Sequence, residues 1–542
     1  MTRRGVRRVL PALMLVATGL VFGLPQAVTG APAESRESAP VATPVAAPVA
    51  TPQVHGSAAR IATPSGNFRP AAPLPAGPRS TETREQLAAS QAVKPPQRPV
   101  VGGRATPLAP PAPQLSFEGL NAGVCCGRPP DTHGAVGLSY FVEVTNLKGV
   151  GVFRKSDGVL VKNVTLNSFF GYPTTTIFDP RVVYDRRWNR WVVFAVAFQE
   201  SSTIQNVFLG VSVTSDPTGA FILYKFDVPE PSGDFFDYPQ LGMDQDALIV
   251  TANIFSGNTY VRSRVFGIPK AAVYSGWSFS APYVNVGTPG TVAPPIVEDN
   301  NSNAYLLAAS VTDATHLKLF RATGLGRSGA TVALQASVPV PAFAVPPDAR
   351  QPGTTGRLDT LNARFQNVST QIGDQLLNVH TINTGGFPTP KWYQVDTEGA
   401  GANTVPAGRS GFVLESADSD DFNPSLVGSP VGGTASNPIG RMFFTWTATD
   451  AVGSGLHQAT VKGSGRLATD PVNVTGGSTL TTAPTFYNPS SDTVERWGDY
   501  SAVSIDPVAA GTCGVGQRAW IVNERHTSMT VWGSRFGRLG FC

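Results

Sequence analysis

The chain repeats a pair of short segments seven times, and this repeat limits the possible folds more than any other feature. The first segment of each pair opens on Asp, Asn or Pro, and a more apolar segment follows it. Strand-like runs bounded by Gly, Pro, Asn and Asp recur about every sixty residues, without a helical pattern between them. The first segments span 131–136, 179–185, 237–244, 294–299, 359–364, 423–428 and 499–506, and the second span 140–146, 191–196, 247–253, 304–310, 375–380, 442–447 and 519–524.

Third and fourth strand-like runs follow in most units, as residues 207–213 and 221–226 illustrate. Four antiparallel strands per unit is the layout of a β-propeller blade. We therefore predict an all-β fold, a single β-propeller of about seven four-stranded blades, with six or eight blades as the alternatives. A large β-sandwich array is the structural rival, although sandwiches rarely repeat so regularly.

The composition agrees with this fold and argues against a nucleic-acid partner. Hydrophobic residues make up 41% of the chain and charged residues 14%, so the Lys, Glu and Arg that cover helix surfaces are scarce. The formal net charge of +4 is small for 542 residues and gives no electrostatic footprint for nucleic acid. We expect a monomer that binds no nucleic acid.

The first 31 residues have the pattern of a secretory signal peptide. Four arginines precede an apolar run, Val9–Leu24, and small residues at Ala27–Ala31 mark a cleavage site. The apolar run is short for a membrane span and no later segment is long enough, so we predict no transmembrane segment. The protein is accordingly expected to be secreted and extracellular.

Residues 32–113 are dominated by Ala, Pro, Thr, Ser and Val and have no period that could bury a face. We predict that they form a disordered stalk in front of a propeller domain at 114–542. The stalk would act as a spacer that holds the domain away from a membrane or cell wall, or as a cleaved pro-segment.

Three phrases resemble those of a known protein group. They are Pro129–Gly137, Asp179–Asp185 and Arg496–Ser501, and they are similar to phrases of secreted bacterial β-propeller proteins related to the sialidase (BNR-repeat) superfamily, mostly uncharacterised. The resemblance covers nearly all of the body and implies the scaffold. Sialidases carry Asp-box hairpins, of which Ser215–Phe221 is a degenerate version, and the Arg-Ile-Pro motif of their arginine triad is absent. The resemblance therefore does not imply sialidase activity.

The four cysteines of an exported protein are expected to form disulfides. Cys125 and Cys126 precede the first unit, whereas Cys513 and Cys542 lie in the last one. Because a propeller must seal its last blade against its first, we favour cross-links between these two ends. A vicinal Cys125–Cys126 bond with a separate Cys513–Cys542 bond is the second alternative, and a metal site is the third.

Polar residues of different units are predicted to meet at one mouth of the central channel. In an up-and-down blade the first strand lines the channel and pairs antiparallel with the second, so first-strand starts and second-strand ends share one face. Side chains two residues further along share the orientation of the first. The set is Asp131, Asp179, Asp237, Asp359, Asn423 and Asp499 at first-strand starts, Asn146, Asn253, His380, Asn523 and Glu524 at second-strand ends, and His133 and Arg181 beside them.

Two interpretations of this set remain open. An Asp before a strand commonly caps a turn, which would make the repeated aspartates scaffold. Alternatively, carboxylates that face one channel would raise each other's pKa, or collect a hard cation such as Ca²⁺, although no cofactor is required. In that case the ligand-binding candidates are Asp179, Asp237, Tyr238, Asp359, His380, Arg496 and Glu524.

A catalytic site would use residues that the repeat itself does not need. The candidates are Asp131, His133, Arg181, Asp499 and Tyr500. A glycosidase would use Asp131 as acid/base, with His133 as a proton shuttle, and Tyr500 as nucleophile. Arg181 or Arg496 would bind an anionic sugar. Arg496 is equally compatible with a packed blade edge.

A second acidic group lies on a predicted loop of the sixth unit. Asp418, Asp420 and Asp421 could bind Ca²⁺, or they form a solvated acidic loop. Serine-hydrolase, zincin and phosphate-loop motifs are absent from the sequence.

Two functions from different classes follow. The first is a secreted, non-catalytic β-propeller that recognises an extracellular glycan, cell-surface polymer or protein at the channel mouth. The alternative is a secreted glycan-cleaving enzyme, either a glycoside hydrolase or a polysaccharide lyase. A deep pocket with one acid-base pair would favour the enzyme, and a filled channel would favour the binding protein.

Overall fold

The computed structural model describes residues 53–62, 96–99, 110–123 and 128–542, apart from 147, 202, 229–232, 302 and 454. For 53–62 it describes the backbone alone. The predicted signal peptide, most of the predicted stalk, Cys125 and Cys126 lie outside the described residues. In the described part of the chain, no helix is long and apolar enough to cross a membrane.

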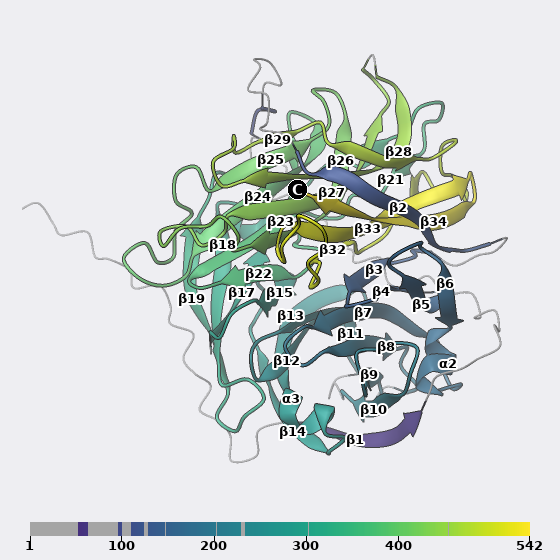
Figure 1. The fold of residues 1–542 in the computed structure, drawn as a ribbon, viewed down its shortest axis with the longest axis vertical. Helices are drawn as coiled ribbons and strands as arrows, with labels where there is room; N and C mark the ends of the chain where they lie inside the picture. The colour runs from purple at the N-terminus through teal and green to yellow at the C-terminus, as the bar shows by residue number, and fades with distance from the viewer. Residues whose placement is uncertain are drawn as a thin grey trace, which may run out of the picture. The chain divides into compact units, whose positions relative to one another are not determined.

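The described strands are arranged in seven blades that follow one another along the chain (Figure 1). Blade 1 holds β3 (His133–Val136), β4 (Tyr140–Thr145), β5 (Gly149–Arg154) and β6 (Leu160–Val164); blade 2 holds β7 (Ile177–Asp185), β8 (Arg190–Ala197), β9 (Asn206–Ser212) and β10 (Phe221–Asp227); blade 3 holds β11 (Phe235–Met243), β12 (Ala247–Ser256), β13 (Thr259–Pro269) and β14 (Phe279–Asn285). Blade 4 holds β15 (Val292–Ala293) with β16 (Pro295–Val297), β17 (Asn303–Ala309), β18 (His316–Thr323) and β19 (Thr331–Pro339); blade 5 holds β22 (Ser369–Ile372), β23 (Gln375–Thr384), β24 (Phe387–Asp396) and β25 (Ser410–Leu414). Blade 6 holds β26 (Asp420–Ser429), β27 (Arg441–Asp450), β28 (His457–Leu467) and β30 (Ser478–Thr482); blade 7 holds β32 (Ala502–Ile505), β33 (Arg518–Ser528), β34 (Val531–Gly540) and β2 (Ala112–Asn121).

The ring is closed by strands from the two ends of the propeller domain. Strand β2 pairs antiparallel with β34, so the outer strand of blade 7 comes from the segment that precedes blade 1 (Figure 1). The Phe117 ring packs 5.6 Å from the Phe536 ring across this pair. The structure is therefore a seven-bladed β-propeller whose last blade is completed by an early strand.

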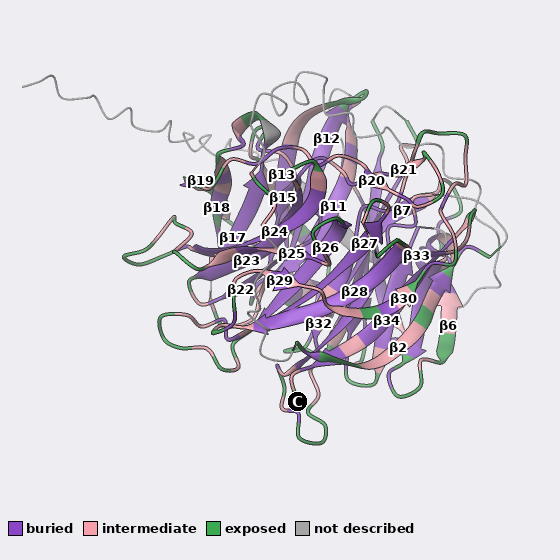
Figure 2. Ribbon diagram, turned by 90° about the horizontal axis from the view of Figure 1, so that it is seen from above, coloured by how far each residue is buried: buried purple, intermediate pink, exposed green. Residues whose placement is uncertain are grey.

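Neighbouring blades are held together by apolar clusters that alternate with the sheets. One buried cluster lies at each of the seven contacts between successive blades, including the contact of blade 7 with blade 1. Figure 2 shows the strands buried along most of their length, with exposure concentrated in the connecting loops. Burial on both faces explains why the second segments of the repeat read as nearly continuous apolar runs.

The inner strands leave one edge without a strand partner, and side chains of the preceding blade cap several of its N–H groups. Val136 N–H donates to Ser504 Oγ at 3.1 Å, and Gly428 N–H donates to Thr370 Oγ1 at 3.2 Å. Blade 4 uses backbone instead, because β16 pairs parallel with both β11 and β22. Polar side chains on the inner strands are thus part of the scaffold.

The predicted second strands are confirmed in all seven blades, whereas one first strand was misplaced. The innermost strand of blade 5 begins at Ser369, ten residues after Asp359. Leu361 and Ala363 adopt positive φ angles of 60° and 66°, which interrupt an extended strand. Just before them, β21 (Arg357–Leu358) pairs with β20 (Ala349–Arg350) and β31 (Val494–Glu495).

The range predicted to be a stalk contributes one strand, at 53–62. Strand β1 (Gln53–Ala62) pairs antiparallel with β10 and with β14, the outer strands of blades 2 and 3. Strand edges on blade rims are open to such pairing because their N–H and C=O groups lack partners. Arg98 also contacts the domain, since its guanidinium pairs with Asp421 at 3.2 Å.

Candidate functional site

The starts of several inner strands carry a repeated backbone irregularity. Asp131, Asp179, Tyr238 and Asn423 have φ angles of 51°, 51°, 54° and 49°, in the left-handed region. In the last three, a proline follows and the register with the second strand shifts at that point. A β-bulge of this kind changes the direction of side chains at the end of a strand. The repeated Asp-Pro, Tyr-Pro and Asn-Pro pairs are therefore bulge positions.

Asn146 joins Asp131 to Asp179 at this end of the channel. Its Nδ2 donates to Asp131 Oδ2 at 2.6 Å, and its Oδ1 accepts the Asp179 N–H at 2.7 Å. The second oxygen of Asp131 accepts the Asp499 N–H at 2.8 Å. The structure thus brings together predicted site residues from blades 1 and 2 and from the segment leading into blade 7. We call this end of the channel the aspartate mouth.

Tyr500 and Arg181 fill the channel just inside the aspartate mouth. The Tyr500 hydroxyl donates to Asp179 Oδ2 at 2.7 Å, and the Arg181 guanidinium lies 3.2 Å from the Tyr500 ring centre. Arg181 also donates to Pro239 O, Asn367 Oδ1 and Gln366 O at 2.9, 3.1 and 3.2 Å. Arg181 and Tyr500 are both 0% exposed. Their polar atoms are engaged inside the protein, away from any ligand in solution.

Amide side chains from blades 5, 6 and 7 pack around Arg181 and Tyr500. We call these buried polar residues together the plug. Asn367 Nδ2 donates to Pro424 O at 3.1 Å and to Ser501 Oγ at 3.2 Å. Asn523 Nδ2 donates to Asn423 O at 3.0 Å. These bonds join blades that lie far apart in the sequence, so the plug acts as a polar core for the ring.

Burial raises the pKa of the carboxyl groups at the aspartate mouth. The pKa of Asp179 rises to about 7, first because of burial and then because of the charges of Asp237 and Asp499. The pKa of Asp131 rises well above its usual range, through burial and then Asp499 and Asp179. Burial raises the pKa of Asp237 to about 6 and that of Glu524 well above its usual range. At a given pH these four carboxyl groups therefore hold more protons than they would in water.

Arg496 lies at the rim of the aspartate mouth and is paired on both sides. Its Nη2 lies 2.7 Å from Asp499 Oδ1, and its Nε lies 3.3 Å from Asp359 Oδ2. The Tyr238 hydroxyl donates to Asp499 O at 3.1 Å, while Arg364 covers the Tyr238 ring at 4.5 Å. These ligand-binding candidates bind mainly one another.

Among the other candidates from second-strand ends, His380 belongs to the core. It is 0% exposed and stacks on Phe365 at 4.8 Å, and its Nδ1 lies 2.6 Å from Ala363 O. Burial lowers the pKa of His380 to about 4. Glu524 does reach the aspartate mouth, where its Oε1 accepts the Thr132 N–H at 3.1 Å.

The three aspartates of the predicted calcium loop do not face one point. Asp420 binds Arg350 through both oxygens, at 2.5 and 2.8 Å. Asp421 pairs with Arg98 and accepts the Trp446 indole N–H at 2.9 Å. Across the described residues, no group of three His, Cys, Asp or Glu side chains could hold a metal ion. Asp418 is exposed.

The favoured disulfide pattern was wrong, because Cys513 and Cys542 bond to each other. The cross-links expected between the two ends of the ring would have needed both of these cysteines. Cys513 precedes β33 and Cys542 follows β34, and these strands pair so that Arg518 lies opposite Gly540. The hairpin therefore brings the two cysteines together, with a Cα–Cα distance of 5.4 Å.

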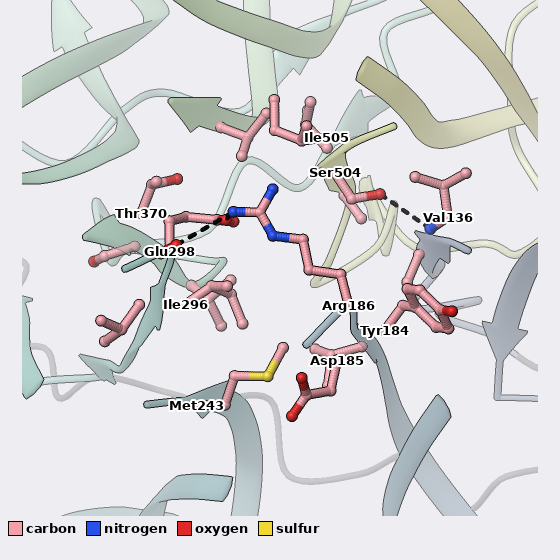
Figure 3. A pocket seen from close by; sticks show the side chains of 18 of the residues that line it. Val136, Tyr184, Asp185, Arg186, Met243, Ile296, Glu298, Thr370, Ser504 and Ile505 are labelled. Carbon is pink, nitrogen blue, oxygen red and sulfur yellow. Dashed lines mark hydrogen bonds and ion pairs between the residues drawn. The ribbon is translucent and has the colours of Figure 1, made fainter. Parts of the chain in front are cut away.

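The opposite end of the channel is hollow. An inner cavity of about 110 Å³ is lined by inner-strand residues of all seven blades. His133 and Asn367 belong to this lining, and Asn367 also bonds Arg181. Figure 3 shows Arg186 extending across the cavity toward Glu298, with which it forms an ion pair. We call this end the arginine mouth.

An outer groove of about 640 Å³ continues from the inner cavity. Arg186, Arg187 and Glu298 line both spaces. Trp188 lies between Arg187 and Asn189 in the chain, and these two neighbours both line the groove. The Trp188 side chain is 51% exposed. A groove of this size is typical of ligand-binding clefts.

Sequence reasoning missed the arginine mouth because it followed only the starts of first strands. The residues that line this end sit at the ends of the same strands, and most are small or apolar. A signal was present in Asp185-Arg186-Arg187-Trp188, where charges and an aromatic residue follow a buried strand directly.

Comparisons with known proteins do not identify a family. No protein-family model and no curated protein matches the chain. Among solved structures, the exo-β-1,3-galactanase from Phanerochaete chrysosporium is 13% identical, with a TM-score of 0.29 over 61% of this chain and 75% of that one. A Synechocystis apocarotenoid oxygenase variant is 11% identical, with a TM-score of 0.38 over 66% and 72%. A subtype N10 neuraminidase-like protein of A/little yellow-shouldered bat/Guatemala/060/2010 is 10% identical, with a TM-score of 0.34 over 66% and 98%. Similarities at this level carry no conclusion on function.

Proposed function

We propose that this β-propeller is a non-catalytic extracellular protein that binds a glycan in the outer groove at the arginine mouth. The observation that carries the proposal is the contrast between the two ends of the channel. At the aspartate mouth, Arg181 and Tyr500 are fully buried and bonded within the protein, whereas the arginine mouth opens into a groove and a cavity. Among the described residues, the groove and the cavity thus give a ligand space at the second end.

Trp188 supports a glycan as the ligand. It is half exposed in the turn between β7 and β8, and its ring packs edge-on against Tyr274 at 5.9 Å. The Tyr274 hydroxyl in turn donates to Asp185 Oδ2 at 2.8 Å. An exposed aromatic ring, fixed between the groove-lining residues Arg187 and Asn189, offers a flat apolar face with polar groups beside it in the chain, which suits a sugar ring.

A glycan-cleaving enzyme is the second candidate, and one observation favours it. The pKa values of Asp179 and Asp237, about 7 and about 6, are in the range that general acids use near neutral pH. Structural carboxylate networks shift pKa values in the same way. Since Asp179 is 5% exposed and bonded to Tyr500, we favour the scaffold role.

The test is a screen of the purified protein against neutral, sialylated and uronic-acid polysaccharides. Binding is measured beside released reducing ends and unsaturated products. We expect a glycan that binds without turnover, and binding at least about tenfold weaker in Trp188→Ala. Trp277→Ala is the matched control, because Trp277 is 66% exposed and lies outside the groove.

Three outcomes would contradict the proposal. Turnover that Asp179→Asn abolishes would establish the enzyme and move the site to the aspartate mouth. Equal loss of glycan binding in Trp188→Ala and Trp277→Ala would exclude the groove. Binding of a protein but of no glycan would change the ligand class.

A further inference from the structure

The inner cavity has walls that are mainly apolar. Its lining includes Val136, Met243, Ile296, Val427 and Ile505, contributed by five different blades. An apolar cavity of roughly 150 Å³ accommodates a molecule of the size of benzene, so about 110 Å³ suits a body of five or six heavy atoms. A whole pyranose ring with its hydroxyl groups is larger than this.

The charged groups around the cavity are paired within the protein. Arg186 pairs with Glu298, as Figure 3 shows, and Lys270 Nζ lies 2.7 Å from Asp185 Oδ2. Arg187 donates to Asp299 O at 3.2 Å. A charged ligand would leave water and then compete with these partners, so the arrangement favours an uncharged one.

Two polar side chains of the lining have capacity left for a ligand. His133 Nδ1 accepts the Val182 N–H at 3.3 Å, so the proton of the neutral imidazole is on Nε2. Burial and the charge of Arg181 lower the pKa of His133, which keeps the ring neutral. Within the described part of the chain, neither His133 Nε2 nor the Ser425 hydroxyl has a bonding partner, and both residues line the cavity. They offer donors at the closed end.

From this combination we propose that the inner cavity is a binding site for a small uncharged group with an apolar body and a carbonyl oxygen. The apolar body would occupy the space between the valine, isoleucine and methionine side chains. The carbonyl oxygen would accept hydrogen bonds from His133 Nε2 and the Ser425 hydroxyl. Such a group is either a free small molecule or a substituent, such as an acetyl group, on a ligand held in the outer groove. The second form rests on the proposed function.

The first experiment uses the full-length protein and free probes. Cyclopentanone is compared with cyclopentane, cyclopentanecarboxylate and cyclopentylamine by saturation-transfer NMR and competition titration. We expect cyclopentanone to bind at least about tenfold more tightly than either charged probe, and more tightly than cyclopentane. Equal binding of all four probes, or no binding of cyclopentanone, would overturn the proposal.

Cavity-filling variants locate the site. Ile296→Phe and Ser425→Val reduce the cavity from two different blades, so misfolding of one leaves the other as a test. Both should weaken cyclopentanone binding at least about tenfold, whereas Ile204→Phe, at an exposed turn outside the cavity, should leave it unchanged. Unchanged binding in a folded filling variant would place the probe elsewhere and contradict the proposal.

A second arm distinguishes a free ligand from a substituent. Acetylated xylan oligosaccharides are compared with the same oligosaccharides after saponification, which removes the acetyl groups without adding charge. Stronger binding of the acetylated form, lost in Ile296→Phe, would assign the cavity to the substituent. If cyclopentanone binds and neither oligosaccharide does, the cavity is a site for a free molecule. If no polysaccharide binds in the screen described above, only the proposed function fails, and the cavity proposal is unaffected.

Discussion

The hydroxyl of Tyr500 donates a 2.7 Å hydrogen bond to Oδ2 of Asp179, which joins the segment entering blade 7 to blade 2 across the channel. The two residues are 321 positions apart in the sequence and both are buried. A tyrosine and an aspartate that could serve as nucleophile and acid are here bonded to each other. Their contact stabilises the ring.

Removal of this bond should destabilise the protein. Tyr500→Phe leaves a buried carboxyl without one of its partners, and we expect a loss of about 1–3 kcal/mol in the free energy of unfolding. Denaturant titration measures it. Tyr140→Phe is the matched control, since no described residue bonds the Tyr140 hydroxyl, and it should change stability by less than about 0.5 kcal/mol. Equal effects of the two variants would show that the Tyr500 bond contributes nothing.

The pH dependence of stability should carry the signature of Asp179. Its pKa is raised from 3.8 to about 7, so the folded state keeps a proton that the unfolded chain has lost. The stabilisation from this group is complete below pH 3.8 and declines as the pH rises toward 7, by about 1.4 kcal/mol per pH unit. Asp179→Asn should remove that slope.

The measurement is the difference in unfolding free energy between wild type and Asp179→Asn across this pH range. The difference between the two proteins is needed because His380 and His526 have pKa values lowered to about 4. These two histidines make the folded protein more stable as the pH rises, which is opposite to the effect of Asp179. A difference that does not vary with pH would mean that Asp179 has an ordinary pKa in the folded protein.

Loss of the disulfide should weaken the final hairpin. Cys513 and Cys542 are 29 residues apart in the sequence, and a closed loop of this length corresponds to about 3–4 kcal/mol in the chain-entropy model. We expect Cys513→Ala/Cys542→Ala to lower the unfolding free energy by that amount. Non-reducing peptide mapping provides a second check, and a peptide that links Cys513 to Cys125 or Cys126 would contradict the pairing described above.

Closure of the ring depends on a glycine in β2. A Cβ atom at Gly119 would lie against the Ser534 hydroxyl and 2.5 Å from Glu143 Oε2, both in the interior. Gly119→Ala should therefore cost about 1–3 kcal/mol, measured by denaturant unfolding. In Gly356→Ala the nearest atom to the new Cβ would be 3.4 Å away, so this variant should remain close to wild type. A stable Gly119→Ala protein would mean that β2 is not needed in this register.

The blade repeat could be predicted because the second strands are buried on both faces and their apolar runs are almost continuous. The first strand of blade 5 could not be predicted, since Asp359 is followed by residues with positive φ that interrupt the strand. The meeting of Asp131, Asp179 and Asp499 followed from antiparallel pairing within blades. The role of this cluster did not follow, because it depends on contacts such as Tyr500 with Asp179 that no local pattern encodes. The inner cavity went unpredicted because valine and isoleucine give no chemical signal of open space.

Hydrogen–deuterium exchange with and without a bound glycan tests the central claim most directly, because it shows which channel mouth the ligand covers. We predict slower exchange in peptides that contain Arg186–Asn189, Gly428–Val431 and Val515–Gly516, which border the outer groove. Peptides with Asp131 and Asp499 should exchange as in the free protein. Protection confined to the Asp131 and Asp499 peptides would contradict the account and return the site to the aspartate mouth.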